Sequence, residues 1–268
     1  MRPIVYNKSN MMRKGSAQGM KLFFFDLDGT LMANDSISDR NLDALHRLRA
    51  AGHKLFINSG RSCGTVPARV KTMFPWDGMI CGSAYVTLDG ALLAHEVIPH
   101  DTLPLIMAYC RSSGTDVNLE GENDLYFWRC DGHRGLTFDE VLANGDALRL
   151  TKATLLKPVE RPHWNDFPGM HVIDMGTYSE LICNGYNKST GMALIGERLG
   201  VGREDMVAFG DSPNDTEMLA YAGCAVVMAH APHELDAYAD LRTSPGPDGV
   251  AEGIRTLFPA LFDDPAAQ

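Results

Sequence analysis

Long apolar runs are missing from this sequence of 268 residues. A membrane-spanning helix needs roughly 20 consecutive apolar residues, and no stretch of the chain approaches that length. The start of the chain also lacks the shorter apolar stretch and small-residue cleavage site of a secretory signal peptide. We therefore expect a cytoplasmic protein that does not contact a membrane.

Positive charge is also scarce. The chain has 24 lysine and arginine residues against 34 aspartate and glutamate residues, which gives a net charge of −10. We expect no general nucleic-acid binding, because that function requires basic side chains that neutralise many backbone phosphates. A single small phosphate can still be bound, since a helix N-terminus or a metal ion holds it without a basic surface.

Paired cysteines are absent as well: the six cysteines are scattered, and none forms a C-x-x-C motif. This distribution favours reduced thiols in a cytosolic protein over a disulfide framework or a zinc site. The cysteines are Cys63, Cys81, Cys110, Cys130, Cys183 and Cys224. His230 and His233 form an H-x-x-H pair, which we interpret as an incidental helical spacing and not as a metal site.

The composition is that of an ordinary globular protein, with 45% hydrophobic and 22% charged residues. The length corresponds to one large domain or two modest ones. Residues 1–20 differ from the rest, because they contain basic residues and no acidic ones, with Gly, Ser, Asn and Gln among the residues between them. We expect residues 1–20 to be a basic, disordered tail that ends where Met20 begins a strand.

Strand and helix patterns alternate in the first and last thirds of the chain. Residues 21–26 are a continuous apolar run, which is typical of a parallel strand buried on both faces. The other predicted elements are a helix capped by Ser38 and ended by Gly52, strands at 55–57, 79–81, 207–209 and 224–228, and helices at 62–73, 188–199, 213–221, 232–239 and 248–258. The alternation predicts an α/β fold with a parallel sheet, formed by residues 21–84 and 184–268.

The middle of the chain, residues 85–183, has a different pattern. Two stretches rich in strand-forming residues, 115–130 and 170–183, are accompanied by helical patterns near 101–112 and 137–144. Strands and helices that do not alternate regularly are typical of an α+β arrangement. We therefore predict a separate inserted domain over 85–183.

The strongest local signal is Asp26-Leu27-Asp28-Gly29-Thr30, which comes directly after the first apolar strand. Alternation along an extended segment places Asp26 and Asp28 on the same side, and Gly29 lets the chain turn away. Open α/β sheets bind ligands at the carboxyl ends of their strands. An acidic turn would account for one carboxylate but not for two, so we interpret the pair as functional.

Further polar residues follow other predicted strands. Asp211 and Asp215 form a second acidic cluster after a strand, and several converging carboxylates repel one another unless a cation lies between them. An all-oxygen ligand set favours Mg²⁺. Ser59 and Gly60 offer a hydroxyl and backbone N–H groups to an anion, and Lys188 at a helix start supplies positive charge for a phosphate.

Four motifs in this order resemble the haloacid dehalogenase superfamily of phosphohydrolases. They are F-F-D-L-D-G-T at 24–30, F-I-N-S-G-R at 56–61, N-K-S-T-G at 187–191 and A-F-G-D-S-P-N-D-T-E-M-L at 208–219. The long interval between the second and third motifs is similar to that of Cof-like subfamily IIB. This resemblance implies a Rossmann-like core with an inserted α+β cap domain of the C2B type. It also implies hydrolysis of sugar phosphates and related small phosphate esters.

The resemblance implies a role for each matching residue. Asp26 would be the nucleophile that forms an aspartyl-phosphate, and Asp28 would be the general acid and base. Mg²⁺ would be held by Asp26, the backbone carbonyl of Asp28 and Asp211, with Asp215 in or behind this ligand set. The residues implied to contact the phosphate are Leu27 through its backbone N–H, Ser59, Gly60, Lys188 and Asn214. The implied partner is a small phosphate ester, and we expect a monomer or a weak homodimer.

Three departures from the family pattern affect local turns and substrate contacts but remove no catalytic group. Gly82-Ser83-Ala84 stands where Asn-Gly-Ala is usual, Ser212 replaces a common Gly, and Ala229-His230 replaces a common Gly-Asn. In the inserted domain, the charged segment 129–134 follows three aromatic residues. It could read a sugar, but we favour its interpretation as a solvated loop.

Two other functions stay open at this point. A phosphomutase would use the same core but return the phosphoryl group to its substrate, so that an isomer forms without free phosphate. A catalytically idle sugar-phosphate-binding regulator would bind phosphate esters with Mg²⁺ and turn none over. Against the second alternative, every position that the resemblance assigns to catalysis is filled.

Overall fold

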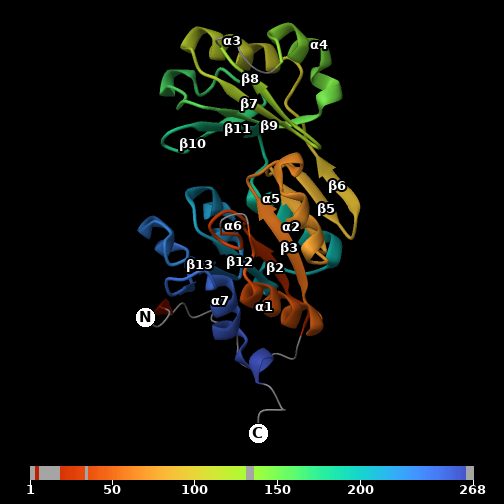
Figure 1. Cartoon of the computed structure of the whole chain (residues 1–268), viewed down its shortest axis with the longest axis vertical. Coiled ribbons are helices and arrows are strands. Elements are labelled where there is room, and N and C mark those ends of the chain that lie inside the picture. Colours follow the sequence, from red (N-terminus) through yellow and green to blue (C-terminus); the bar gives the residue numbers. More distant parts are fainter. Residues whose placement is uncertain (1–3, 6–18, 34–35, 131–135, 264–268) are drawn as a thin grey trace.

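The computed structural model describes residues 4–5, 19–33, 36–130 and 136–263. These residues form two sheets, one of nine strands and one of five. Figure 1 shows the larger sheet with its helices in one part of the molecule and the smaller sheet in a second part above it. The predicted α/β fold with a parallel core sheet is confirmed.

The larger sheet has the strand order β1-β14-β13-β12-β2-β3-β4-β5-β6. Its strands are β1 (Ile4–Val5), β2 (Leu22–Phe25), β3 (Lys54–Ser59), β4 (Gly78–Cys81), β5 (Tyr85–Leu88), β6 (Ala91–His95), β12 (Met206–Gly210), β13 (Cys224–Val227) and β14 (Leu241–Arg242). The strands from β14 to β4 pair in parallel, and β1, β5 and β6 are added at the two edges by antiparallel pairing. The central position of β2 explains why residues 22–25 are all apolar.

Helices cover both faces of the larger sheet. They are α1 (Asp39–Ala50), α2 (Ala68–Met73), α5 (Lys188–Leu199), α6 (Thr216–Tyr221) and α7 (Gly249–Leu257). Because successive residues of a strand point to opposite faces, Phe23 and Phe25 pack with α1, α2 and α7, whereas Leu22 and Phe24 pack with α5 and α6. Two cores therefore hold β2, and with it the start of the loop that contains Asp26.

The smaller sheet has the strand order β10-β11-β9-β7-β8, and all of its pairs are antiparallel. Its elements are α3 (Leu103–Ser113), β7 (Val117–Gly121), β8 (Leu125–Trp128), α4 (Phe138–Leu148), β9 (Leu150–Leu155), β10 (Met170–Asp174) and β11 (Ser179–Cys183). One face of the sheet packs its apolar side chains with α3 and α4. The opposite face is turned toward the larger sheet, since Lys152 on β9 donates a hydrogen bond to the carbonyl of Gly60.

The predicted boundary of the inserted domain at residue 85 differs from the structure. The strands β5 and β6 belong to the larger sheet, because the chain turns back directly after β4 and pairs Tyr85 with Cys81. We propose that the inserted domain, called the cap below, begins after His95. The segment expected to be a disordered tail contributes β1, which pairs with β14; residues 1–3 and 6–18 lie outside the described residues.

Three predicted helices are shorter or tighter than expected. The helix predicted over 62–73 is split, because Pro67 precedes α2 and a separate 3₁₀ turn lies at Cys63–Thr65. The helix predicted over 213–221 begins as a 3₁₀ turn at Pro213–Asp215 and continues as α6. The helix predicted over 232–239 is a 3₁₀ helix, His233–Ala237. The remaining 3₁₀ turns lie at Arg161–His163, Arg203–Asp205 and Pro259–Phe262.

Two further observations bear on the sequence-based expectations. No helix among the described residues is long and apolar enough to cross a membrane. All six cysteines lie within the described part of the chain, and each is a free thiol in the structure.

Helix α5 depends on close packing against the larger sheet. A Cβ atom at Gly191 would lie 2.8 Å from three carbons of Ile80 on β4, and Ile80 is fully buried. We expect Gly191→Val to lower the free energy of unfolding by roughly 1–3 kcal/mol, as overpacking of a core typically does. The position of Lys188 should also be disturbed, because this residue is in the first turn of the same helix. Glu197→Val, an exposed position of α5, should change stability by less than about 0.5 kcal/mol. Chemical denaturation of both variants checks this, and equal effects would contradict it.

Candidate active site

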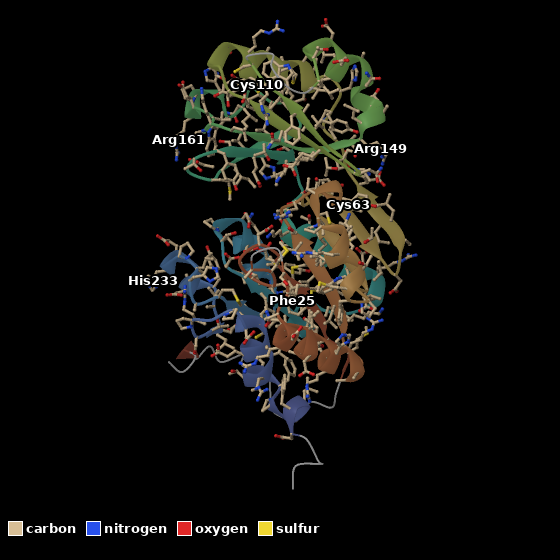
Figure 2. The ribbon with its side chains drawn as sticks, in the orientation of Figure 1. Phe25, Cys63, Cys110, Arg149, Arg161 and His233 are labelled. Carbon is tan, nitrogen blue, oxygen red and sulfur yellow. The ribbon has the colours of Figure 1, made fainter. Side chains whose placement is uncertain are left out.

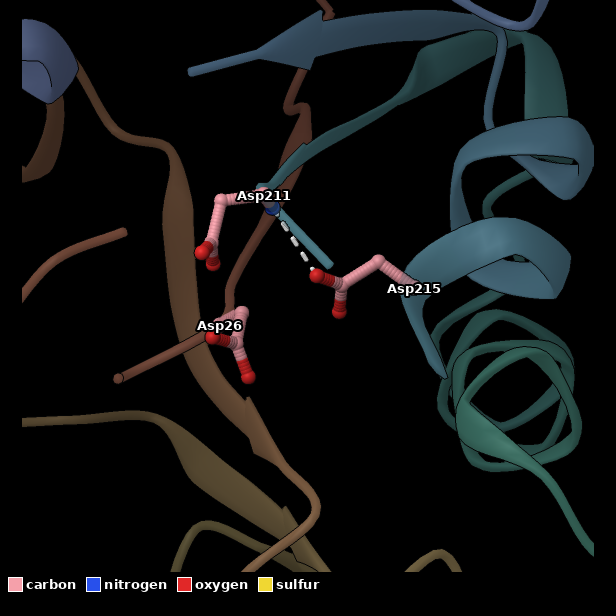
Figure 3. A group of neighbouring side chains, drawn as sticks. All are labelled: Asp26, Asp211 and Asp215. Carbon is pink, nitrogen blue, oxygen red and sulfur yellow. Dashed lines mark hydrogen bonds between the residues drawn. The ribbon is translucent and has the colours of Figure 1, made fainter. Parts of the chain in front are cut away.

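Three carboxylates meet where β2 and β12 end. Asp26 follows β2, while Asp211 and Asp215 follow β12, the neighbouring strand. One carboxylate oxygen from each residue lies within 4.8 Å of the others. Figure 3 shows the three side chains pointing toward a common centre. The structure thus brings together the two acidic clusters that are separated by about 180 residues in the sequence.

Lys188 lies between two of these carboxylates. Its ammonium nitrogen is 2.6 Å from Oδ1 of Asp26 and 2.5 Å from Oδ1 of Asp215. The lysine side chain is only 1% exposed, so its charge is balanced almost entirely by these carboxylates and not by water. The start of α5 is fixed by Asn187, whose side chain accepts hydrogen bonds from the backbone N–H groups of Ser189 and Thr190.

A second constraint on the start of α5 comes from β3. The amide of Asn58, which is fully buried, donates a 3.0 Å hydrogen bond to the carbonyl of Lys188. The Lys188 side chain is therefore positioned by its own helix cap and by the neighbouring strand. Asn58 lies within the second motif of the sequence, but the motif alone does not indicate this contact.

Both oxygens of the Asp215 carboxylate accept hydrogen bonds from other groups of the protein. Its Oδ2 accepts hydrogen bonds from the backbone N–H groups of Asp211 and Ser212 at 2.9 and 3.0 Å, and its Oδ1 is bound by Lys188. Gly210 is required beside it, since a Cβ at that position would lie 2.7 Å from the Asp215 side chain. Asp215 therefore shapes the loop after β12 and places Lys188.

Asp211 is held by two donors that the sequence analysis did not assign. The hydroxyl of Thr30 donates to its Oδ1 at 2.8 Å, and Nε2 of His230 lies 3.2 Å from its Oδ2. Gly29 has a φ of +85°, and a Cβ there would lie 2.4 Å from the Asp211 carboxylate. Gly29 is thus needed both for the turn after Asp28 and for the space in front of Asp211.

Burial sets the protonation behaviour of this cluster. Burial raises the pKa of Asp26 from 3.8 to about 8, although the Lys188 ammonium lowers it and the Asp215 carboxylate adds to the rise. Burial also raises the pKa of Asp211, against the hydrogen bond from Thr30. Burial acts to lower the pKa of Lys188, but the carboxylates of Asp215 and Asp26 outweigh it and raise that pKa. A cation placed among these groups would favour their charged forms.

Asp28 lies apart from the three carboxylates. Both of its oxygens are bound by Arg61, with Nε at 2.6 Å and Nη2 at 2.7 Å, in a bidentate ion pair. Arg61 also donates to the carbonyl of Thr65, which fixes the guanidinium. The sequence predicted that the side chains of Asp26 and Asp28 lie on the same side of an extended segment; in the structure the two residues share a loop, and Arg61 holds the Asp28 carboxylate toward the loop after β3.

The other residues implied to contact a phosphate come from the end of β2, from β3 and the loop that follows it, and from the loop after β12. Ser59 ends β3 and is 1% exposed, and its hydroxyl accepts a hydrogen bond from the backbone N–H of Arg61. Asn214 is oriented by Ser212, whose hydroxyl donates to its Oδ1, and its Nδ2 would be 3.1 Å from a Cβ at Gly60. Leu27 has a fully buried side chain, which holds its backbone at the end of β2.

A cavity of about 430 Å³ adjoins these residues. The core contributes Gly60, Lys188 and Asn214 to its walls, and the cap contributes strands β9, β10 and β11. This volume is within the range of small-molecule sites, roughly 300–1,000 Å³. The departure Ser83 also lines the cavity. The described residues of the charged cap segment, Arg129 and Cys130, are not among its lining residues, and residues 131–134 lie outside the described part of the chain.

The carboxylate cluster fits a divalent metal. Asp26 Oδ2 has no hydrogen-bond partner among the described residues, and the Asp211 oxygens each have a single donor. An all-oxygen donor set of this kind suits Mg²⁺, which keeps several waters and binds one or two carboxylates with a substrate phosphate. Asp215 is committed to Lys188 and to backbone N–H groups, so Asp26 and Asp211 are the side chains available to a metal.

Sequence reasoning missed four residues of this site: Thr30, Asn58, Arg61 and His230. Thr30, Asn58 and Arg61 lie inside motifs that were recognised, but their partners are distant in the sequence, as with Thr30 and Asp211. His230 was interpreted as part of an incidental pair with His233, and the two histidines indeed bond to different aspartates, Asp211 and Asp236. The departure from Gly-Asn to Ala-His at 229–230 is the signal that could have directed attention to it.

Comparisons with known proteins agree with this geometry. The family model of haloacid dehalogenase-like hydrolases matches residues 23–141 and 163–254. One relative is 5-amino-6-(5-phospho-D-ribitylamino)uracil phosphatase YitU of Bacillus subtilis strain 168, which is 29% identical over 268 residues, with 88% of this chain and 97% of the relative covered. Another is a putative phosphatase of Haemophilus influenzae, 25% identical, with 89% and 98% covered.

Solved structures show the same fold. The phosphatase BT1666 from Bacteroides thetaiotaomicron has a TM-score of 0.79 at 22% identity, with 93% of this chain and 99% of that chain covered. The subclass IIB sugar phosphatase BT4131 has a TM-score of 0.77 at 22% identity, with 88% and 98% covered. Since the family model spans most of the sequence and includes Asp26, Ser59, Lys188 and Asp211, the chain belongs to the haloacid dehalogenase-like hydrolases.

Proposed function

We propose that the protein is a Mg²⁺-dependent phosphatase that hydrolyses small phosphomonoesters, above all sugar phosphates, through a phosphorylated Asp26. The observation that carries this proposal is the buried cluster of Asp26, Lys188 and Asp211, in which Lys188 also lines a small cavity. The named relative that acts on a phosphorylated ribityl compound, and the subclass IIB sugar phosphatase of the same fold, support this substrate class.

Asp26 is placed to attack the phosphorus of a bound ester. Lys188 holds the Asp26 carboxylate through Oδ1, and this carboxylate is the nucleophile. A carboxylate and a phosphate dianion repel each other, and the Lys188 ammonium, the Asn214 amide and the Ser59 hydroxyl offset this repulsion at the equatorial oxygens. When bound by Asp26 and Asp211, Mg²⁺ supplies additional positive charge at the same oxygens. The covalent aspartyl-phosphate divides one difficult displacement into two easier ones.

In this proposal Asp28 moves the proton. It lies two residues after the nucleophile, outside the carboxylate cluster, and its side chain is about half exposed, at 49%. As general acid it donates a proton to the leaving alkoxide, and as general base it then takes one from the attacking water. Arg61 holds this carboxylate in one orientation through both of its oxygens, so its position is fixed before the substrate binds.

Phosphate release from a panel of esters tests the function directly. Hexose, pentose and polyol phosphates, together with nucleotides, would be compared with Mg²⁺ and with EDTA. Release of free phosphate from sugar phosphates only with Mg²⁺ is expected. Conversion to an isomer without free phosphate would instead identify a phosphomutase, and binding without turnover would identify a regulator.

The metal assignment predicts the effect of Asp211→Asn. This change removes one of the two carboxylates available to the metal but keeps an oxygen for Thr30. We expect the concentration of Mg²⁺ needed for half-maximal activity to rise at least tenfold, with kcat also lowered. Asp43→Asn, an exposed residue of α1, is the matched control and should behave like the unchanged protein. Full activity of either protein in EDTA would contradict the assignment.

The two aspartates of the first motif should differ in their covalent intermediates. Asp28→Asn keeps the nucleophile but lacks the base for water attack, a loss typically worth about 10²–10⁴-fold in rate. With an activated ester such as p-nitrophenyl phosphate, we expect a burst near one equivalent and then slow turnover. Intact-mass spectrometry after rapid quenching should show a phosphoryl adduct in Asp28→Asn and none in Asp26→Asn. An adduct in both variants would overturn the assignment.

The raised pKa of Asp26 predicts how stability depends on pH without metal. Because the folded state binds this proton more tightly than the unfolded state between pH 3.8 and about 8, the free energy of unfolding contributed by Asp26 falls as pH rises through that window. In EDTA, Tm should therefore drop more between pH 5.5 and pH 8 for the unchanged protein than for Asp26→Asn. Mg²⁺ should reduce the difference. Identical pH slopes in EDTA would contradict this.

A further inference from the structure

The cap face that is turned toward the core contains three buried charged residues. They are Glu120 on β7, Lys152 on β9 and Glu180 on β11, which are adjacent strands, and their exposed fractions are 7%, 4% and 7%. Their neighbours in the same strands, such as Leu119, Ala153 and Leu181, belong to the apolar core on the other face. The charges are therefore placed on the core-facing side by strand alternation, and nothing in the catalytic roles above uses them.

Lys152 connects this cluster to the phosphate side of the cavity. Its ammonium nitrogen is 2.7 Å from Oε1 of Glu180, 3.3 Å from Oε1 of Glu120 and 2.8 Å from the carbonyl oxygen of Gly60. A lysine has three N–H donors, and all three have an acceptor here. The ammonium is thus fixed, and it holds the cap against the loop that follows β3.

Glu120 and Glu180 differ in how many of their carboxylate oxygens accept hydrogen bonds from the protein. Oε1 of Glu120 accepts from the hydroxyl of Thr154, and its Oε2 accepts from the backbone N–H of Ser62. Glu180 is bound by Lys152 through Oε1, and its Oε2 has no hydrogen-bond partner among the described residues. Of these two acids, Glu180 is the one that lines the cavity. Its second oxygen is therefore available to a molecule inside.

The walls of the cavity divide it into two ends of different charge. The phosphate end has Lys188 and Asn214, and the cap end has Lys152 with the acids Glu180 and Asp174; Glu217 is also in the lining. Burial lowers the pKa of His171 in the same lining, so this ring is neutral at neutral pH. Since the N–H donors of Lys152 are all occupied, a leaving group at the cap end meets hydrogen-bond acceptors and negative charge.

We propose that Glu180, held by Lys152, determines substrate specificity by accepting a hydrogen bond from a hydroxyl or ammonium group of the leaving group, and that the site rejects esters with a second anionic group. This inference rests on the proposed phosphatase function and adds the substrate class. A hydrogen bond to a carboxylate is among the stronger ones in proteins. A site built to bind such a group discriminates strongly against molecules that lack it, because its buried polar atom is then left unpaired.

Three probes and one substitution test the inference. The probes are a hexose 6-phosphate, its C1-carboxylate counterpart 6-phosphogluconate, and p-nitrophenyl phosphate, whose leaving group has no hydrogen-bond donor. In Glu180→Gln, the amide oxygen can stay with Lys152, which turns a donor toward the cavity. We expect the ratio of kcat/KM for hexose 6-phosphate to that for p-nitrophenyl phosphate to fall about tenfold or more. The ratio for 6-phosphogluconate relative to hexose 6-phosphate should rise by a similar factor.

Two further variants distinguish a specific effect of Glu180 from a general loss of stability or activity. Glu160→Gln, which changes an exposed cap residue outside the cavity, should leave both ratios unchanged. Lys152→Met combined with Glu180→Leu removes both members of this ion pair, while Glu120 keeps its hydrogen bonds from Thr154 and Ser62, and should abolish the preference for the hexose ester. Unchanged ratios in Glu180→Gln, with measurable p-nitrophenyl phosphate hydrolysis, would overturn this inference alone. Absence of hydrolysis of every ester by the unchanged protein would overturn the proposed function as well.

Discussion

The buried ion pair between Lys188 and its two aspartates is the interaction on which the rest of the site depends. A fully buried ammonium is tolerated only when its charge is balanced and its donors are satisfied, and here Asp26 and Asp215 do both at 2.6 and 2.5 Å. This condition requires β2, β12 and the start of α5 to meet at one point. The two apolar cores on opposite faces of the larger sheet maintain that meeting point.

The cap uses the same principle of buried, paired charge for a different purpose. Its α3 and α4 face is an apolar core, whereas its other face contains Lys152 between two glutamates. Lys152 also donates a hydrogen bond to the backbone carbonyl of Gly60, so the core supplies one of the acceptors of this cap ammonium. The phosphate end and the leaving-group end of the cavity are thereby linked through one loop, residues 59–62, which contacts both.

The sequence was sufficient for those parts of the fold that depend on local patterns. The apolar run before Asp26 and the Ser38 cap predicted β2 and the start of α1, and the four motifs predicted which strand ends come together. The boundary predicted at residue 85 assigns β5 and β6 to the inserted domain, whereas these strands pair into the larger sheet. They are short strands whose pattern fits either sheet, and only pairing with β4 decides between them. Thr30, Arg61 and His230 were missed as site residues because their partners are defined by tertiary contacts and not by neighbours in the chain.

The connection between the cap and α5 has a mechanical consequence. The last strand of the cap ends at Cys183, and α5 begins at Lys188, so only residues 184–187 separate the two. This segment is short and is fixed at its far end by the Asn187 cap. Any rotation of the cap relative to the core therefore exerts a torque directly on the helix end that carries the phosphate-binding ammonium. In this chain the segment that leads from the cap back to the core, residues 184–187, is followed directly by Lys188.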